Sequence, residues 1–487
     1  MPTKKKANEA QFFFFCSGQP EDTFEVMNFS GIDEVSSLYK FDVTLISENA
    51  DIDADDVINK QATLLVYRDE EYYPYSGIVM EFKFMGKNHD RATYVLKLAP
   101  KLWLLELSKQ SRIFQKKTVP QILKLVLDNA QLSDYYSLKL DDSKYPELEY
   151  VVQYQESDLN FISRLMEKNG IWYFFNENPL LPEEVDGTSG SETLLITDKT
   201  ANFESIGDPE EILFRTEMGM TEQIEEDDKE SVHGLQYNRY VVPTDVLLKD
   251  YNYRTPEVDL TGKKAVTSGD TGSVYEYGGH FKNVTEAANA AGIESDRLAT
   301  QQIVLDGAGN CRGMRAGKRF TLTEHFKDDL NTTYVLTQVL HLGAHTMEGD
   351  SANVFSYRNR FRCIPSDRAD MFRPRLRAAV PGFLASSPPR SRPTVPVTRA
   401  LTTWEGTRCA CLSTCQTPII TMRRGTYGWR SLTAARTTGC ISRRTKAPKW
   451  CSPASTGTPT GRWALPWSPT RTPFRPWSAR TSSRAAY

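Results

Sequence analysis

The stretch that decides the fold is Gln153–Phe175, which reads QYQESDLNFISRLMEKNGIWYFF. Ser157 is a residue type that caps the start of helices, and Gly170 is one that ends them. Between them, apolar residues recur at the spacing of one helix face, namely Leu159, Ile162, Leu165 and Met166. The apolar run Ile171–Phe175 is typical of a buried strand. The stretch therefore predicts a helix over 157–169 that is followed at once by a strand.

The first hundred residues alternate between apolar and polar side chains, which is the pattern of strands with one buried face. The clearest runs are Phe41–Leu45 and Ala92–Leu98. Two further candidate strands, Ala62–Arg68 and Tyr72–Phe84, flank the acidic turn that begins at Asp69. Five or six such strands predict a sheet that curls into a small barrel or sandwich.

The rest of the globular sequence mixes helices with strands. Helical spacing predicts helices over 119–129, where Pro120 suits a first turn, and over 285–300. Paired strands are predicted for Gly317–Thr323 and Tyr334–Leu340. The polar, acidic region 183–230 is predicted to form loops.

Charge divides the chain near position 376. Residues 376–487 hold 18 of the 59 Lys and Arg residues but only one of the 62 acidic residues, Glu405. The tail is therefore +17, and residues 1–375 are −20. An acidic surface argues against a nucleic-acid partner, which requires a basic footprint. A chain of 487 residues is also too long for one core, so at least two domains are expected.

Several segments carry a resemblance to one family. The stretch Ser111–Gln115, the helix over 119–129 and the block Gln153–Phe175 together resemble the VgrG family, the spike proteins of the type VI secretion system. Further similar segments occur across residues 10–375, namely Phe41–Ser47, Arg315–His325, Asn359–Pro365 and Phe372–Pro374. The block Gln153–Phe175 is specific enough to carry the resemblance alone.

The resemblance implies a β-rich α+β fold like that of phage tail hubs, with two β-barrel subdomains and inserted helices in residues 1–375. It also implies a homotrimer that connects a secretion tube protein and baseplate components to a needle, and that can carry effectors. The predicted role is mechanical and not enzymatic. Two alternatives stay open: a delivery domain of a secreted effector enzyme, and a prophage tail protein, which genomic neighbours would distinguish.

The family would continue from Pro381–Gly382 into an OB-fold and a β-helical needle, but here the sequence departs from that pattern. Beyond this point the chain is rich in Arg, Pro, Ser, Thr, Trp and Cys and has no hydrophobic period, as in a GC-rich gene translated out of frame. Shifting the codons by one base allows Thr402–Thr407 to read Asp-Asp-Met-Gly-Arg-Tyr, which is similar to the start of the family's OB-fold. In the same frame, the codons of Gly457–Arg462 can encode a sequence that is similar to the end of that OB-fold. Residues 376–487 are therefore predicted to be a frameshifted, disordered remnant of the OB-fold region.

No catalytic, cofactor-binding or metal site is predicted. His341 and His345 lie four residues apart, but on a predicted strand, where they do not share a metal-binding helix face. Gly307–Gly313 misses the dinucleotide-binding fingerprint by one residue. The acidic run Glu225–Asp228 lacks the turn glycine of calcium loops. The tail cysteines lack zinc-site spacing, and a shifted reading frame accounts for them: Cys409, Cys411, Cys415, Cys440 and Cys451.

The remaining signals concern the cellular compartment. No apolar run reaches the roughly 18 residues of a membrane span. Lys4–Lys6 followed by Phe12–Phe15 imitates a signal peptide, but this apolar stretch is shorter than the usual ~7–15 residues. We therefore expect cytoplasmic synthesis without a signal peptide and export by the type VI apparatus. The remaining cysteines are expected to be buried thiols: Cys16, Cys311 and Cys363.

Overall fold

The computed structural model describes residues 11–379, apart from 186–190, 208, 216–229 and 346–356, together with four short strands further on. The chain divides into two units, residues 1–384 and 385–487. In the second unit the described strands pair as β22 (Ile419–Thr421) with β25 (Thr433–Ala435) and β23 (Arg424–Gly425) with β24 (Gly428–Trp429). Apart from these strands and residues 376–379, the tail lies outside the described residues. The expectation that it is a disordered, frameshifted remnant therefore stays a prediction.

Six antiparallel strands form the N-terminal sheet, in the order β1-β4-β5-β6-β3-β2. Their bounds are β1 (Phe12–Cys16), β2 (Glu25–Glu34), β3 (Lys40–Ser47), β4 (Gln61–Arg68), β5 (Glu71–Asn88) and β6 (Arg91–Ala99). Alternate side chains such as Phe41 and Leu64 are fully buried inside it. The sheet curls so that the Phe12 ring of β1 meets the Phe29 ring of β2 edge-on, with centroids 5.1 Å apart. The predicted strands of the first hundred residues are confirmed.

Six later strands close into a barrel by hydrogen bonding alone. They follow the ring β20-β21-β18-β14-β13-β19, and β19 pairs again with β20. Their bounds are β13 (Glu211–Phe214), β14 (Ser231–Arg239), β18 (Ile303–Gly309), β19 (Lys318–Thr323), β20 (Thr333–Ala344) and β21 (Tyr357–Pro365). The two-residue β12 (Glu204–Ser205) adds to β19. Phe320 and Leu336 fill the barrel interior.

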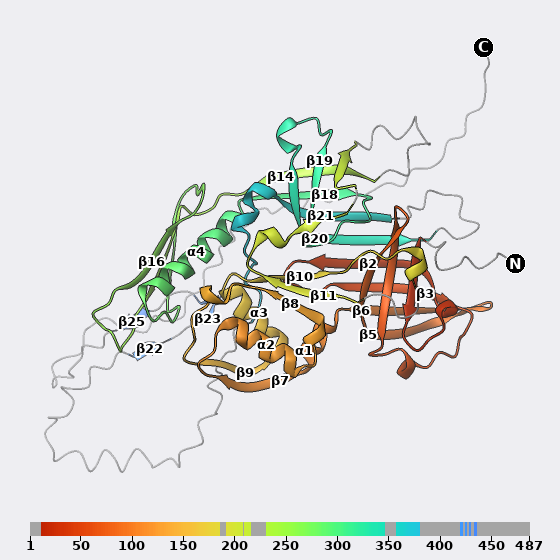
Figure 1. Ribbon diagram of the computed structural model, residues 1–487. Helices are drawn as coiled ribbons and strands as arrows, with labels where there is room; N and C mark the ends of the chain where they lie inside the picture. Colours follow the sequence, from red (N-terminus) through yellow and green to blue (C-terminus); the bar gives the residue numbers. More distant parts are fainter. Residues whose placement is uncertain are drawn as a thin grey trace, which may run out of the picture. The chain divides into compact units, whose positions relative to one another are not determined.

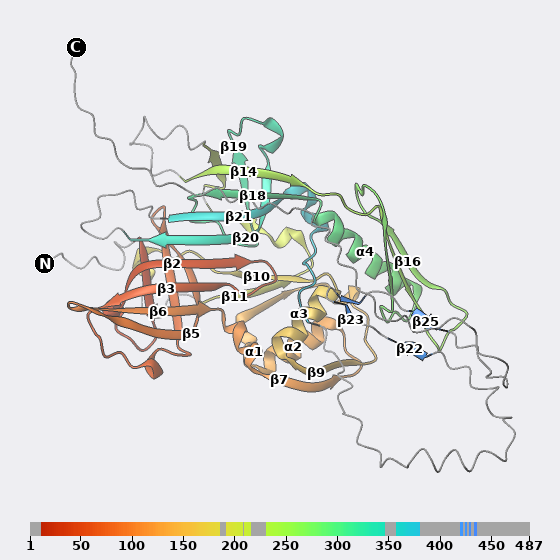
Figure 2. The ribbon, with the colours of Figure 1, turned by 180° about the vertical axis from the view of Figure 1, so that it is seen from behind.

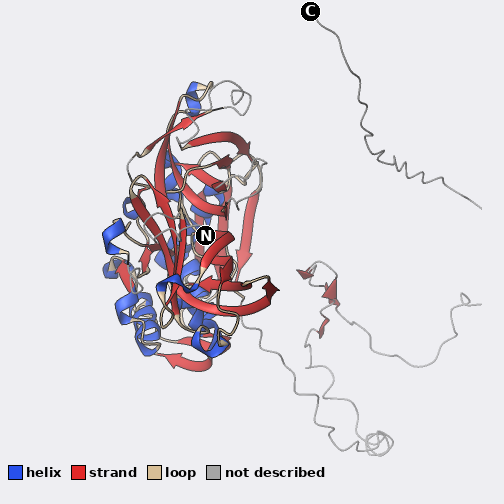
Figure 3. Ribbon diagram, turned by 90° about the vertical axis from the view of Figure 1, so that its right-hand side faces the viewer, coloured by secondary structure: helices blue, strands red, loops and turns tan. Residues whose placement is uncertain are grey.

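One strand joins these two parts. The long β20 belongs to the closed barrel and also pairs with β2, where Ile32 lies opposite Leu340. The two parts therefore share one continuous 13-stranded sheet, in which β2, β20 and β21 lie side by side (Figures 1 and 2). In the described part of the larger unit, more residues lie in strands than in helices (Figure 3). The β-rich fold class is confirmed.

A helical insert follows the N-terminal sheet, and it holds the stretch Gln153–Phe175. Its elements are α1 (Leu104–Leu107), β7 (Lys109–Phe114), α2 (Val119–Asn129), β8 (Tyr136–Lys139), β9 (Val151–Ser157), α3 (Asp158–Lys168), β10 (Trp172–Asn176) and β11 (Thr193–Thr197). The Ser157 hydroxyl accepts the Asn160 N–H and caps α3, and Gly170 has a left-handed φ of 66° just after its end. The prediction of a helix followed at once by a strand is confirmed.

A smaller sheet packs against the last helix, α4 (Val284–Thr300). It contains β15 (Asp245–Asp250), β16 (Leu260–Ala265) and β17 (Ser273–Tyr277), with β15 in the centre. Val246 and Leu248 point toward α4 and share its buried cluster with Ala291. The helix over 285–300 was predicted, whereas these three strands were not.

Close approach of α4 to β16 depends on Gly262. A Cβ atom at this position would lie 2.1 Å from the main-chain oxygen of Ala287, which cannot move without moving the helix. We expect Gly262→Ala to lower the free energy of unfolding by about 1–3 kcal/mol through overpacking. Gly234→Ala is the matched control, because a Cβ there meets nothing within 4 Å. Equal effects of the two substitutions in chemical denaturation would contradict this account.

The prediction that residues 183–230 form loops is wrong for several segments. β11, β12 and β13 all lie within this range. The polar surroundings conceal short apolar runs, and Ile212 in β13 is almost completely buried in the closed barrel. Tertiary burial therefore overrides the local composition. The acidic run Glu225–Asp228 lies outside the described residues.

Candidate functional site

A buried charge network lies where the N-terminal sheet, the helical insert and the closed barrel meet; it consists of Arg315, Glu177, Asp33 and Glu192. The Arg315 side chain reaches it from the turn before β19, and its Nη2 lies 3.3 Å from Glu177 Oε1. The guanidinium carbon lies 3.9 Å from the centre of the Tyr75 ring. The Arg315 and Glu177 side chains are only 4% and 1% exposed. Removing either partner of a pair so well shielded from water would leave the other charge buried without a counter-charge.

Each carboxylate of this network accepts a backbone N–H, although the second oxygen of Glu192 has no hydrogen-bond partner. Glu177 accepts the Ser76 N–H at 3.1 Å, and Asp33 Oδ2 accepts the Ala316 N–H at 3.0 Å. Glu192 accepts the Lys101 N–H at 2.9 Å. Each bond links two segments that are far apart in the sequence. The network therefore fastens β2, β5, the insert and the closed barrel to one another.

Burial raises the pKa values of these carboxyl groups. The pKa of Asp33 rises to about 6 because of desolvation, although the Arg315 charge opposes the shift. The pKa of Glu192 rises to about 7, again through desolvation and then through the nearby negative charge of Glu177. Burial also raises the pKa of Glu177, against the effect of Arg315. One arginine therefore neutralises only part of the cluster, and protons neutralise more of it in mild acid.

His341 lies beside this network inside the sheet junction. Its Nδ1 lies 2.7 Å from the Tyr357 hydroxyl and its Nε2 lies 3.3 Å from the Tyr75 hydroxyl. Burial, followed by the Arg315 charge, lowers the pKa of His341 to about 3. The imidazole is therefore neutral at physiological pH.

His345 lies just beyond the end of β20, in a separate contact. Its Nε2 accepts the Phe12 N–H at 3.2 Å and so helps to hold β1 beside β20. Within the described residues, no group of three or more His, Cys, Asp or Glu side chains is arranged to hold a metal ion. Cys16, Cys311 and Cys363 are free, buried thiols as predicted.

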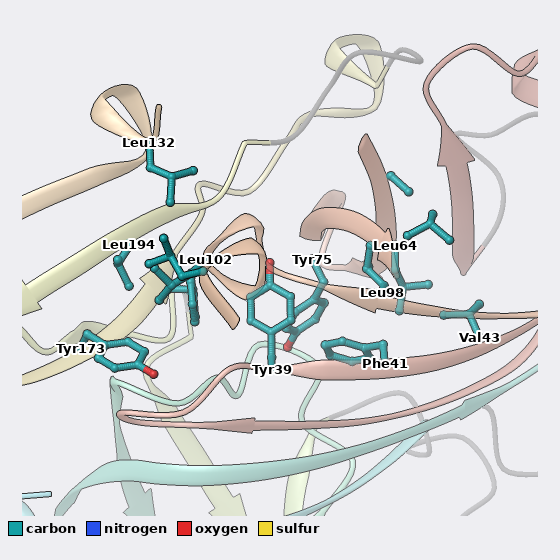
Figure 4. Close-up of a cluster of buried hydrophobic side chains, with 14 of the residues drawn as sticks. Tyr39, Phe41, Val43, Leu64, Tyr75, Leu98, Leu102, Leu132, Tyr173 and Leu194 are labelled. Carbon is teal, nitrogen blue, oxygen red and sulfur yellow. The ribbon is translucent and has the colours of Figure 1, made fainter. Parts of the chain in front are cut away.

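An aromatic cluster continues from the network into the N-terminal sheet (Figure 4). The Phe41 and Tyr75 rings lie 4.5 Å apart, and the Tyr39 ring meets Tyr75 at 6.3 Å in an edge-on arrangement. The Tyr39 hydroxyl donates to the Ser76 carbonyl oxygen. Arg315 thus lies against packed rings, and this arrangement is suited to rigidity.

The opposite face of the same junction is exposed and partly apolar. We call it the junction face, and it consists of Ile32, Leu340, Leu342, Arg358 and Arg360. Leu340 and Leu342 are 43% and 41% exposed, although they lie in the centre of the long sheet. The ladder places Leu340 between Ile32 and Arg360, and Leu342 opposite Arg358. The sequence carried a signal for this face, since two leucines occupy the outward positions of an alternating strand.

The comparisons with known proteins agree on one family. The family model described as phage tail baseplate hub (GPD) matches residues 32–347. The actin cross-linking toxin VgrG1 of Vibrio cholerae is 28% identical over 366 residues, which cover 72% of this chain and 32% of the toxin. The type VI secretion system spike protein VgrG1b of Pseudomonas aeruginosa is 25% identical over 319 residues, which cover 65% of this chain and 41% of the spike protein. The chain therefore spans less than half the length of these relatives.

Solved structures show the same fold. An Escherichia coli component of the type VI secretion system, itself similar to the T4 bacteriophage tail proteins gp27 and gp5, superposes with a TM-score of 0.55 at 21% identity, covering 76% of this chain and 80% of the other. A 43 kDa tail protein of a Shewanella oneidensis prophage superposes with a TM-score of 0.50 at 9% identity, covering 74% of this chain and 99% of the other.

Proposed function

Because this chain belongs to the phage tail baseplate hub family, we propose that it is a hub and spike-base component of a type VI secretion machine. In this role three copies form a ring that connects the secretion tube and baseplate to a needle. The observation that carries the proposal is the extent of the family match, which runs from the last residues of β2 to just beyond β20 and thus includes β3 to β6, the helical insert and every strand of the closed barrel except β21. We infer a mechanical role, because the charged groups of the junction are buried and link the parts of the fold to one another.

The junction face supports assembly from several copies. Exposed leucines in the centre of a sheet are a typical feature of surfaces that become buried on association. A ring on the axis of a tube closes by cyclic symmetry, so the same face is used in every copy. We infer that the tube protein, baseplate components and effectors are the other partners, and that the assembled protein leaves the cell through the type VI apparatus. No described helix is both long enough and apolar enough to cross a bilayer.

We expect the purified chain to form a weak, concentration-dependent trimer that salt strengthens. Residues 1–375 carry about −20 per copy, and salt screens the repulsion between copies. Leu340→Glu adds a charge to the junction face and should raise the concentration at which trimers form by at least tenfold. Analytical ultracentrifugation across concentration and ionic strength measures both effects.

Leu181→Glu is the matched control, because Leu181 is also 43% exposed but lies outside the junction face. It should leave the association unchanged. A stable dimer would contradict the hub assignment itself. A trimer that both substitutions weaken equally would show that the junction face is not the contact.

A second candidate function is delivery of a toxin activity, which the name of one relative favours. We expect the full chain to leave actin unchanged, because the resemblance to that relative covers only 32% of its length. Incubation of the chain with actin, followed by denaturing electrophoresis, tests this directly. Covalent actin oligomers would support the second candidate over the first.

A further inference from the structure

The chain leaves the closed barrel through an extended segment, the exit strap, which we define as residues 371–379. It begins at the last residue of a short 3₁₀ helix, Ser366–Met371, which follows β21. Near its start the Phe372 ring is buried and meets the Trp172 ring edge-on at 5.4 Å. This ring fixes the beginning of the strap against β10.

Helix α4 holds the first half of the exit strap through main-chain atoms. The Arg297 Nε donates to the Pro374 carbonyl oxygen at 2.8 Å, and its Nη2 donates to the Glu167 carbonyl oxygen at 2.8 Å. The Thr300 hydroxyl donates to the Met371 carbonyl oxygen at 2.6 Å. Arg297 is only 5% exposed. One buried arginine therefore ties the strap to the end of α3.

Helix α3 holds the second half in the same way. The Glu167 carboxylate accepts the N–H groups of Arg377, at 3.0 Å, and Ala378, at 3.1 Å. Asn160 makes a reciprocal pair with Ala379, accepting its N–H at 2.9 Å and donating to its carbonyl oxygen at 2.8 Å. The strap thus runs antiparallel to α3, from the last turn of the helix back to its first.

The side chains of the second half contribute little to this binding. Arg375 and Leu376 are exposed, and residues 378 and 379 are alanines. The one described side-chain contact from this half is an ion pair between Arg377 and Glu34. A surface that binds consecutive amide N–H and carbonyl groups recognises the path of a chain rather than its sequence.

We propose that α3 and α4 form a main-chain clamp that fixes the position and direction in which the chain leaves the hub, whatever the sequence beyond Pro374. The clamp excludes only proline at 377–379, because proline lacks the N–H that Glu167 and Asn160 accept. Because the clamp binds main-chain atoms, it would hold the strap equally well if the residues from 376 onward are translated from a shifted reading frame, as the sequence predicts. The inference concerns the exit path alone and does not depend on the proposed secretion role.

Hydrogen–deuterium exchange of the full chain tests the clamp. In the wild type we expect the amides of 377–379 to exchange at least tenfold more slowly than those of an unstructured peptide. The double substitution Asn160→Ala and Glu167→Ala should abolish this protection. Glu34→Ala, which removes only the Arg377 ion pair, should leave most of it. Unprotected amides in the wild type, or equal loss in the Glu34 variant, would overturn the proposal.

A second measurement uses the strap itself and leaves the helices unchanged. Ala378→Pro removes one N–H donor, whereas Ala378→Ser keeps it. Trypsin cleavage between Arg375 and Leu376 should be at least tenfold faster in the proline variant than in the serine variant. Equal cleavage rates would show that the main-chain bonds do not hold the strap.

Discussion

Replacing Arg315 with methionine is expected to lower the free energy of unfolding by about 3–5 kcal/mol at pH 8. Arg315 supplies the one cationic side chain of the buried charge network, and its removal leaves Glu177 and Asp33 buried without a counter-charge. Methionine keeps most of the side-chain volume, so the loss reports charge more than packing. Chemical denaturation followed by circular dichroism measures the change.

Arg360→Met is the matched control, because Arg360 is exposed on the junction face, and it should change the stability by less than about 0.5 kcal/mol. Adding Glu177→Gln to Arg315→Met should recover part of the loss, because a neutral amide needs no counter-charge. A loss below about 1 kcal/mol for Arg315→Met would show that the network does not stabilise the junction.

Replacing Glu192 with glutamine is expected to stabilise the protein at pH 8 by about 3 kcal/mol and to have little effect at pH 4.5. The pKa of Glu192 is raised from 4.5 to about 7, so the folded protein holds a proton that the unfolded chain releases. The contribution of this group to stability is therefore complete below pH 4.5 and is lost as the pH rises through 7. Glutamine remains neutral at every pH and avoids that loss.

The quantity to compare is the difference in free energy of unfolding between the variant and the wild type across pH 4.5–8. A difference is needed because other groups in both proteins also titrate in this range. Asp33 acts in the same direction as Glu192, since its pKa is also raised. His341 acts in the opposite direction: its lowered pKa gives stability above pH 6.5 that is lost as the pH falls. A difference that does not change with pH would mean that Glu192 is not a buried, protonated carboxyl group.

Local patterns predicted the elements whose burial follows from their own sequence. The predicted helix over 119–129 coincides with α2, although its start depends on a capping box between Thr118 and Gln121 as well as on Pro120. By contrast, β13 is only four residues long in acidic surroundings. Its burial comes from its parallel neighbours β14 and β19, which no local window contains.

The buried charge network could not be predicted from the sequence for a related reason. Arg315 contacts Glu177, 138 residues away, and the next residue, Ala316, contacts Asp33, 283 residues away. Each residue alone resembles an ordinary surface charge, and only the fold brings them together. The position of His341 on a strand was predicted, but its two tyrosine partners were not.

The pairing of β2 with β20 also determines how long the edge of β2 stays unpaired while the chain is being synthesised. β2 ends at Glu34 and β20 begins at Thr333, so the ribosome makes about 300 residues between the two partners. At a translation rate of roughly 5–20 residues per second, the edge of β2 therefore stays unpaired for about 15–60 s before the synthesis of β20 begins. During that interval the N–H and C=O groups of β2 that later pair with Gln338–Ala344 remain open to other nascent chains. Crowded polysomes and a shortage of chaperones are therefore the conditions in which this protein misassembles first.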